Sequence, residues 1–238
     1  MGSIPIAGGP LTPAGWRSLE PLGDQGVLAR FDSEEAALAW ATAARNRLPH
    51  EVVPAYRTVA VFAPLTDWDY ESLAEKLAGI PPDAARVPGR LLEVPCCYEL
   101  GPDLAESADS LKMPPQELAR LHSSVNYQVF AIGFVPGFPY MGWLPEGLSG
   151  LDRLASPRTR VPAGSVGITG RQTGIYPAEV PGGWRLIGRT PCALCDLTEG
   201  ETGWFALRPG DRVRFRPIDA TTFDHMTGCR PTLLEPAP

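Results

Sequence analysis

The pattern of hydrophobic and polar residues predicts strands and helices in alternation over the first 80 residues. GVLARF at 26–31 is a short apolar stretch typical of a strand, and EVVPAYRTVAVFAP at 51–64 contains two extended pieces rich in β-branched and aromatic residues. Between them, AALAWATAARNRL is rich in helix formers, so we predict a helix over about 33–48. Asp32 and Glu35 have the spacing of an N-cap and its N3 partner in a capping box.

A second helix and a linker complete this first region. DYESLAEKLAG at 69–79 predicts a helix that ends at Gly79, with Thr66 or Asp67 as its cap. IPPDAARVPGR at 80–90 contains three prolines and a glycine, which is typical of a connection between domains. The first 80 residues are therefore sufficient for a small α+β domain.

The second region begins with strands and helices and then becomes rich in turns. RLLEVPCCY at 90–98 and YQVFAIGF at 127–134 predict strands, whereas PDLAESADSL and PPQELARLHSS predict short helices with proline in the first turn. From Gly133 onward, brief strands are separated by glycine and proline, which favours a barrel or a sandwich. We expect a flexible leader, an α+β domain and a mainly-β domain at residues 1–14, 15–85 and 86–238.

Composition and charge exclude several function classes. The 238 residues are 44% hydrophobic and 20% charged, and no window reaches the roughly 18 apolar residues of a membrane span. The N-terminus lacks the basic and apolar regions of a secretory signal, so we expect a cytoplasmic protein. The net charge of −6 argues against nucleic acid as the main partner. From Arg158 to Arg189, however, five arginines and one acid give a local balance of +4, which would suit an anion.

The cysteines predict neither a disulfide framework nor a metal site. Their number is five, and Cys192 and Cys195 have CxxC spacing without a second pair. The two lie in TPCALCDL, which we predict to be a strand, so they face opposite sides of it. His225 and Cys229 have ligand-like spacing but stand alone. We therefore predict structural or incidental roles for the cysteines and no metal.

The stretch VPAGSVGITGRQTGIYP at 161–177 has the most unusual composition in the chain. Its glycines at 164, 167 and 170 recur every third residue, without the lysine of a P-loop or the βαβ context of a dinucleotide fingerprint. Glycine lets a ligand approach backbone N–H groups, and Arg158, Arg160 and Arg171 would reinforce an anion site. The alternative is a set of hairpin turns at barrel corners.

Two further features have a structural and a functional interpretation. GFVPGFPYMGW at 133–143 combines prolines with Phe134, Phe138 and Tyr140, which suits either a rigid pocket wall or a core corner. His122 ends a predicted helix, where a lone histidine is more often a hydrogen-bonded group than a catalyst. No Gly-x-Ser-x-Gly elbow accompanies it, so a serine-hydrolase triad is not expected.

Taken together, these motifs resemble one family. HSSVNYQVFAIGFVPGFPYMGWL, SPRTRVPAGSVGITGRQTGIYP and PGGWRLIGRTP are similar to the family of 5-oxoprolinase B subunits, also named allophanate hydrolase subunit 1 and KipI. PLGDQGVLARF, VVPAYRTVAVFA and LRPGDRVRFRPI extend the resemblance over residues 16–218. It implies an α+β N-terminal domain followed by a cyclophilin-like barrel.

The resemblance also implies an activity and partners. With subunits C and A, the family's complex opens 5-oxoproline to glutamate at the expense of ATP, which normally arrives with Mg²⁺, and subunits B and C are thought to phosphorylate the lactam oxygen. Mapped here, Arg158 would hold an anionic group, Gln172 and Tyr176 would bind the amide, and His122 would orient or shuttle a proton. Phe134, Phe138 and Tyr140 would form an apolar wall, and Gly164, Ser165 and Gly167 would line the cleft.

Other functions remain open within the same resemblance. Related domains of urea carboxylase transfer a carboxyl group from carboxybiotin to urea, although this chain has no Met-Lys-Met biotinylation site. One branch inhibits a sporulation histidine kinase. Proline isomerisation rests only on the analogy of a cyclophilin-like fold. The chain also departs from the family at CCYELGPDL, Val180 and Cys195, which puts contacts made by the first of these in doubt.

Overall fold

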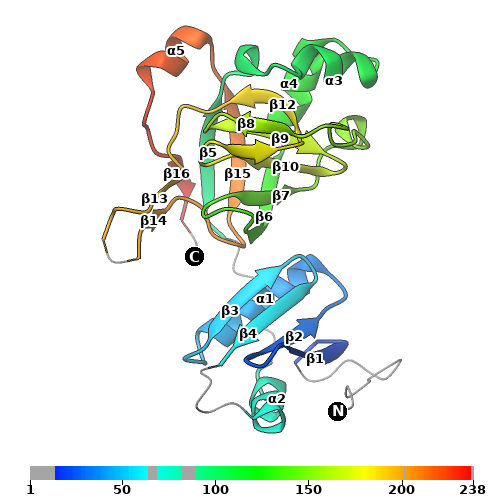
Figure 1. Ribbon diagram of the computed structural model, residues 1–238, viewed down its shortest axis with the longest axis vertical. Coiled ribbons are helices and arrows are strands. Elements are labelled where there is room, and N and C mark those ends of the chain that lie inside the picture. The colour runs from blue at the N-terminus through cyan, green and yellow to red at the C-terminus, as the bar shows by residue number, and fades with distance from the viewer. Residues whose placement is uncertain (1–13, 64–68, 82–88, 201, 237–238) are drawn as a thin grey trace. The chain divides into compact units, whose positions relative to one another are not determined.

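The chain divides into two compact units, residues 1–87 and 88–238 (Figure 1). The computed structural model describes residues 14–63, 69–81, 89–200 and 202–236. Most of the predicted leader and the predicted boundary between residues 85 and 86 lie outside this described part. Ala14, which we assigned to the leader, is instead fully buried in the core of the first unit.

In its described residues, the first unit is an antiparallel sheet with two helices. The strand order is β1-β2-β4-β3, and every neighbouring pair is antiparallel. Alternate residues of the strands are buried, as period-2 patterning requires, and Trp40 of α1 packs against Trp16 and Phe31. The elements are β1 Ser18–Leu22, β2 Gly26–Arg30, α1 Glu34–Arg45, β3 Glu51–Ala55, β4 Thr58–Phe62 and α2 Tyr70–Ala78.

The cap of α1 differs from the prediction. The Ser33 hydroxyl accepts the Ala36 N–H at 3.2 Å, so Ser33 is the N-cap. Asp32 is one residue too early and forms an ion pair with Arg17. The helix ends at Arg45, three residues before the predicted end. The capping-box prediction was therefore wrong by one residue.

The cap of α2 also corrects a prediction. The Asp69 carboxylate accepts the Ser72 N–H at 3.0 Å, and Gly79 is the C-cap, as expected. Thr66 and Asp67, the two predicted caps, lie outside the described residues.

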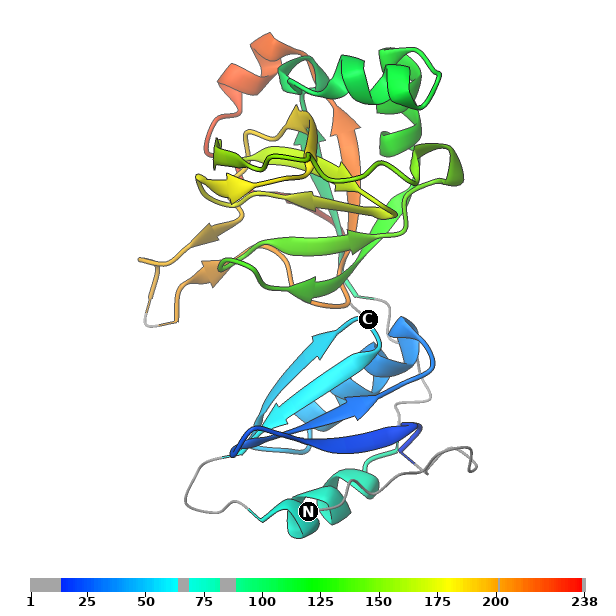
Figure 2. The same ribbon diagram turned by 45° about the vertical axis from the view of Figure 1, so that its right-hand side comes forward.

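The second unit is built around an eight-stranded mixed sheet with the order β12-β9-β10-β7-β6-β15-β5-β16. β15 and β5 are parallel, whereas the other pairs are antiparallel. Helices α3, α4 and α5 lie at one end of this unit in both views (Figures 1 and 2). Beyond the end of β5, Cys97 and Arg189 form an antiparallel bridge with two backbone hydrogen bonds of 2.8 and 2.9 Å.

The elements of this unit are mostly short. They are β5 Leu91–Cys96, α3 Leu104–Ser110, α4 Pro115–Ser123, β6 Asn126–Ile132, β7 Pro139–Gly142, β8 Arg158–Val161, β9 Ser165–Thr169, β10 Gln172–Ile175, β11 Val180–Gly182, β12 Arg185–Arg189, β13 Cys195–Asp196, β14 Trp204–Phe205, β15 Arg212–Pro217, α5 Ala220–His225 and β16 Thr232–Glu235, with single 3-10 turns at Tyr98–Leu100 and Glu146–Leu148. Pro115 starts α4 as predicted, but Pro102 precedes the N-cap of α3 and is not in its first turn. The whole chain is thus a mixed α+β protein with a small antiparallel sheet and a larger, mainly-β mixed sheet.

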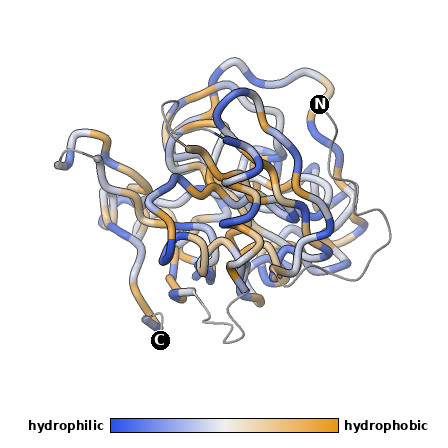
Figure 3. Tube along the Cα trace, turned by 90° about the horizontal axis from the view of Figure 1, so that it is seen from below, coloured by the Kyte–Doolittle hydropathy of each residue, from blue (hydrophilic) through white to orange (hydrophobic). Residues whose placement is uncertain are grey.

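Hydrophobic and hydrophilic residues are interspersed along the tube (Figure 3). In β9, Val166 and Ile168 enter the main core, and Gly167 between them faces the other side. That other side carries a second, smaller cluster, which the two-stranded ribbon β8–β11 covers with Val161 and Val180. The candidate site is built on this outer cluster. No helix of the described residues is long and apolar enough to cross a membrane.

The cysteines overturn the prediction that they form no disulfide. Cys192 and Cys229 form a disulfide, which ties the segment after β15 to the loop after β12. In the predicted strand TPCALCDL, only Cys195 and Asp196 are in a strand. The sequence pattern indicates no cysteine partner for Cys192, because a partner 37 residues away leaves no local signal. Cys195 is a free thiol.

Candidate functional site

Arg158 is held by a carboxylate that sequence reasoning did not assign to it. Its Nη2 donates to Asp103 Oδ1 at 2.6 Å. The Asp103 side chain is 6% exposed and that of Arg158 is 31% exposed, so the pair lies at the edge of the buried region. Nη1 of Arg158 is buried and has no acceptor among the described residues. The guanidinium therefore has a hydrogen-bond acceptor at Nη2 and none at Nη1.

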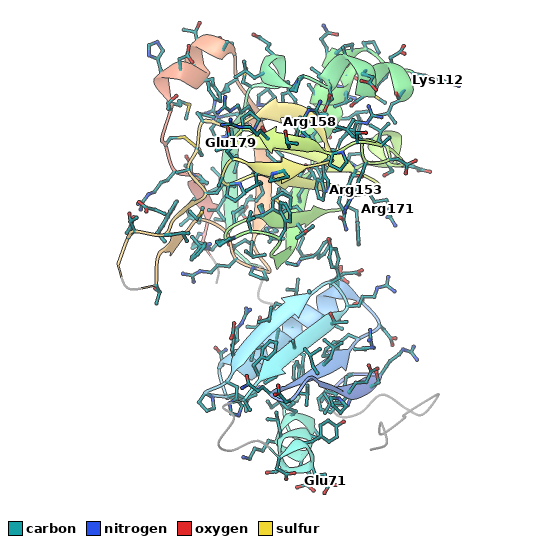
Figure 4. All side chains as sticks on the ribbon, in the orientation of Figure 1. Glu71, Lys112, Arg153, Arg158, Arg171 and Glu179 are labelled. Atoms are coloured by element: carbon teal, nitrogen blue, oxygen red, sulfur yellow. A yellow bond between two sulfur atoms is a disulfide. The ribbon has the colours of Figure 1, made fainter. Side chains whose placement is uncertain are left out.

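The remaining arginines of the predicted anion site are largely neutralised or turned elsewhere. Arg160 pairs with Glu179 at 2.6 Å and Arg185 pairs with Glu106. The guanidinium of Arg171 lies 5.0 Å from the centre of an aromatic ring, that of Trp143. Figure 4 shows Arg171 at an edge of the second unit, apart from Arg158. When Asp103 and Glu106 are included, the local balance of +4 falls to +2. The expected strongly positive patch is therefore much weaker than the sequence indicates.

Two glycines of the 161–177 stretch, Gly167 and Gly174, make room for aromatic residues. Gly167 and Gly174 are cross-strand partners on β9 and β10. A Cβ at Gly174 would lie 2.8 Å from Phe138 Cζ and 2.9 Å from Trp184 Cζ3, and one at Gly167 would lie 3.0 Å from Trp184 Cβ. Only glycine gives the flat surface on which these rings pack. Close approach therefore requires Gly167 and Gly174, but the approaching groups are side chains of the same chain and not the predicted ligand.

The backbone N–H groups expected to bind an anion are already used. Those of Gly164, Ser165 and Gly170 donate to the carbonyls of Tyr176, Pro162 and Leu151, at 2.7, 3.2 and 2.7 Å. Gly164 has φ +82°, and a Cβ there would lie 2.3 Å from a backbone oxygen. The Ser165 hydroxyl also donates to the Pro162 carbonyl, at 2.7 Å. The expectation that these donors face an anion is wrong, because strand and turn pairing takes them.

The predicted aromatic wall exists, and it rests on a cluster of rings that is mostly buried. We call Phe138, Tyr140, Tyr176 and Trp184 the aromatic cluster; their rings contact one another with centroids 4.9–5.9 Å apart. Edge-on contacts of this kind fix the rings relative to one another. Phe134 adds an edge-on contact to Phe138 at 5.6 Å, has φ +69° and is 59% exposed. Of the three predicted wall residues, Phe134 and Tyr140 reach the surface and Phe138 does not.

Tyr176 lies within the electrostatic influence of Arg158, and Gln172 lies at the start of β10. Burial raises the pKa of Tyr176, although a backbone hydrogen bond from Trp184 and the charges of Arg153 and Arg158 act in the opposite direction. Tyr176 is therefore close enough to Arg158 for the charge of the guanidinium to affect its pKa. Gln172 is four residues before Tyr176, which follows the end of β10, and four extended residues span about 13 Å along the backbone. Residues four apart on an extended segment point to the same side, so the predicted joint contact of Gln172 and Tyr176 with an amide remains a proposal.

His122 belongs to a buried chain of hydrogen bonds. The Thr173 hydroxyl donates to the Gly167 carbonyl at 3.1 Å, so it accepts from His122 Nε2 at 2.9 Å. His122 Nδ1 then accepts from the Tyr98 hydroxyl at 2.7 Å. The imidazole is fully buried, and burial lowers its pKa to about 3. At neutral pH the imidazole is therefore uncharged, and it links α4 to β10 by a hydrogen bond. This favours an orienting role over proton transfer.

Among the described residues, no group of three or more His, Cys, Asp or Glu side chains is placed to hold a metal ion. Asp103, Glu106 and Glu179 each face an arginine instead. We therefore assign no residue of this part of the chain to Mg²⁺.

Comparison with known proteins places this arrangement in a family. The family model described as carboxyltransferase domain, subdomain C and D, matches residues 17–205. The chain is 37% identical over 222 residues to the 5-oxoprolinase B subunit of Bacillus subtilis, covering 83% of this chain and 91% of that protein. The chain belongs to the family of 5-oxoprolinase B subunits. Its counterpart in Escherichia coli O157:H7 is 50% identical over 137 residues, covering 57% of this chain and 62% of that protein.

A solved structure supports the family's fold. TTHA0988 superposes with a TM-score of 0.73 and 36% identity, over 82% of this chain. The chain spans only 40% of the length of that protein. The family match contains Arg158, Asp103 and the whole aromatic cluster. The resemblance inferred from the motifs is therefore confirmed.

Sequence reasoning missed Asp103 and Trp184, the two residues that complete the site. Trp184 stands in the motif PGGWRLIGRTP. Its large side chain packs against Gly167 and Gly174, so a tryptophan near a glycine-rich stretch could have indicated it. Asp103 lies 55 residues before Arg158 and gave no signal by spacing. The departure noted at CCYELGPDL does not remove this contact, because GPD itself supplies it.

Proposed function

We propose that this chain acts in the cytoplasm as the B subunit of an ATP-dependent 5-oxoprolinase, together with subunits C and A. The observation that carries the proposal is the 37% identity to the Bacillus subtilis protein, which extends over 91% of that protein. Identity of this extent includes both units of the chain, so it supports a shared role of the whole chain and not of one motif. The proposed substrates of the complex are 5-oxoproline and ATP.

The chemistry requires activation of the lactam oxygen. Transfer of the γ-phosphoryl group forms a bond from phosphorus to that oxygen, breaks the bond to the ADP oxygen and releases the lactam N–H proton. One water then adds to the ring carbon, the C–N bond breaks with protonation of nitrogen, and a second water releases phosphate to leave glutamate. Positioning of the small lactam is the contribution that a chain without its own nucleotide motif can make.

Within this scheme, Arg158 holds an oxygen of 5-oxoproline. Its unsatisfied Nη1 and its partial exposure support this role. Phe134 and Tyr140 supply the accessible apolar surface, while Tyr176, Phe138 and the glycines shape it from beneath. His122 fixes Thr173 and thereby β10. Gln172 begins β10 and is partly exposed, and it remains a proposed hydrogen-bond partner of the lactam.

We also infer that the larger sheet curls into the cyclophilin-like barrel that the resemblance implies. The bridge between Cys97 and Arg189 supports this, because it joins the segment that follows β5 to β12 at the other end of the strand order. Gly188 has no room for a side chain there, since a Cβ would lie 2.6 Å from Cys96 Sγ.

The test is glutamate release from 5-oxoproline and ATP, using this chain co-expressed with subunits C and A and with each subunit omitted in turn. We expect glutamate only from the complete set, and a loss of turnover with Arg158→Ala. A well-formed complex that releases no glutamate would exclude the proposal, and inhibition of a histidine kinase by the chain alone would support the regulatory alternative.

A second candidate is carboxyl transfer to urea or a similar amide. The matched family model is described as a carboxyltransferase domain, which favours it specifically. It predicts that turnover depends on a biotin carrier and is abolished by avidin, whereas 5-oxoproline opening is insensitive to avidin.

A further inference from the structure

Three hydrogen bonds hold Asp103 next to Arg158. Its Oδ2 accepts the backbone N–H of Leu186 at 2.7 Å, while its Oδ1 accepts from Arg158. The Asp103 N–H in turn donates to the Leu186 carbonyl at 2.9 Å. Both oxygens of a nearly buried carboxylate are thus committed, one to β12 and one to the guanidinium. The carboxylate has no rotational freedom left.

The backbone around Asp103 explains why it lies there. A Cβ at Gly101 would lie 2.1 Å from the backbone carbon of Ile187, so only glycine lets this segment run directly against β12. One turn later, Glu106 of α3 pairs with Arg185 of β12. Asp103 is therefore placed by tight backbone contact and not by a loop free to move.

The consequence for Arg158 follows from the shape of the guanidinium. The group is planar with five donors in a fixed fork, so holding Nη2 sets the direction of the other N–H groups. Among these, Nη1 is buried and lacks an acceptor in the described part of the chain. An oxygen that enters beside it completes the hydrogen bonds of the group.

We propose that Asp103 is a positioning residue that orients Arg158 toward one oxygen of the bound lactam. The proposal rests on the proposed function. The charge of Asp103 offsets that of Arg158, so the pair suits a carbonyl or a single carboxylate better than a triphosphate. Asp103 therefore acts on the binding of 5-oxoproline and not on the binding of ATP.

The kinetic test uses the assembled complex with Asp103→Asn, Asp103→Ala, Arg158→Ala and the double variant. We expect Asp103→Asn to lower kcat/KM for 5-oxoproline by about ten- to hundredfold, as removal of a supporting residue does. The KM for ATP should change less than about twofold. In the Arg158→Ala background, Asp103→Ala should have almost no further effect, because both changes remove one unit. Equal losses in both backgrounds would overturn the proposal and leave Asp103 a structural role only.

Glu106→Gln is the matched control. It removes an acid–arginine pair from the same helix, but Glu106 is largely exposed and its arginine is not placed in the site. We expect its kcat/KM to stay within about twofold of the unchanged complex.

A spectroscopic readout separates this proposal from the proposed function. Arg158 side-chain NMR signals, assigned by their loss in Arg158→Lys, should show slow Nη rotation in the unchanged chain and averaged Nη signals in Asp103→Asn. Glu106→Gln should leave them unaltered. If the signals are identical in Asp103→Asn, the proposal is wrong even where glutamate is formed. If they average and no glutamate is formed by the unchanged complex, the arginine is positioned by Asp103 but the 5-oxoprolinase function, and with it the lactam as ligand, is refuted.

Discussion

Gly174 lies under two aromatic rings, and this contact gives the first residue-scale prediction. A Cβ there would lie 2.8–2.9 Å from Phe138 Cζ, Trp184 Cζ3 and a backbone oxygen. Because the rings are held by their neighbours, Gly174→Ala should lower the free energy of unfolding by about 1–3 kcal/mol, as overpacking does. Gly133→Ala is the control, since a Cβ at Gly133 has no neighbour within 4 Å. Urea unfolding measures both. Equal stabilities of the two variants would contradict the seating of the rings on glycine.

The buried His122 predicts a pH dependence of stability. In the unfolded chain its pKa is near 6.5, whereas burial lowers it to about 3 in the folded chain. Between these values the unfolded state binds the extra proton, so stability falls as the pH falls, by about 1.4 kcal/mol per pH unit well below pH 6.5. His122→Gln should have a flatter dependence between about pH 6 and pH 4.5, whatever its stability at neutral pH. Unfolding free energies at matched pH values check this, and parallel slopes would refute it.

At the scale of the element, helix α1 allows its cap to be identified by substitution. Ser33 accepts a backbone N–H of the first turn, and Asp32 only pairs with the exposed Arg17. We expect Ser33→Ala to lower the free energy of unfolding by about 1 kcal/mol and Asp32→Ala to lower it by less than half of that. Hydrogen exchange of the α1 amides localises the effect. A larger loss with Asp32→Ala would restore the capping box that the spacing suggested.

The same helix shows what sequence patterns determine and what they leave open. Alternation and composition located β2 to β6 but missed β1, and they gave the later strands of the second unit no bounds. They could not choose between Asp32 and Ser33, because both residue types cap helices and only the backbone conformation decides. Sequence spacing could not identify Asp103 either, because it meets Arg158 only after the segment before α3 has packed against β12. Partners distant in sequence, and the neutralisation they cause, appear only in the folded chain.

At the scale of the whole molecule, the disulfide between Cys192 and Cys229 closes a long stretch of the second unit, with a sequence separation of 37 residues. Because the bond restricts the unfolded chain across this distance, its reduction should lower the free energy of unfolding by about 2–4 kcal/mol. Cys229→Ser should show the same loss without reductant and no further loss with it. Cys195→Ser is the control, because Cys195 is a free thiol and that variant keeps the bond. Urea unfolding with and without reductant separates these cases. Identical midpoints for the oxidised and reduced chain would mean that noncovalent packing alone, including the Ala193 N–H to Cys229 carbonyl hydrogen bond of 2.8 Å, holds this segment.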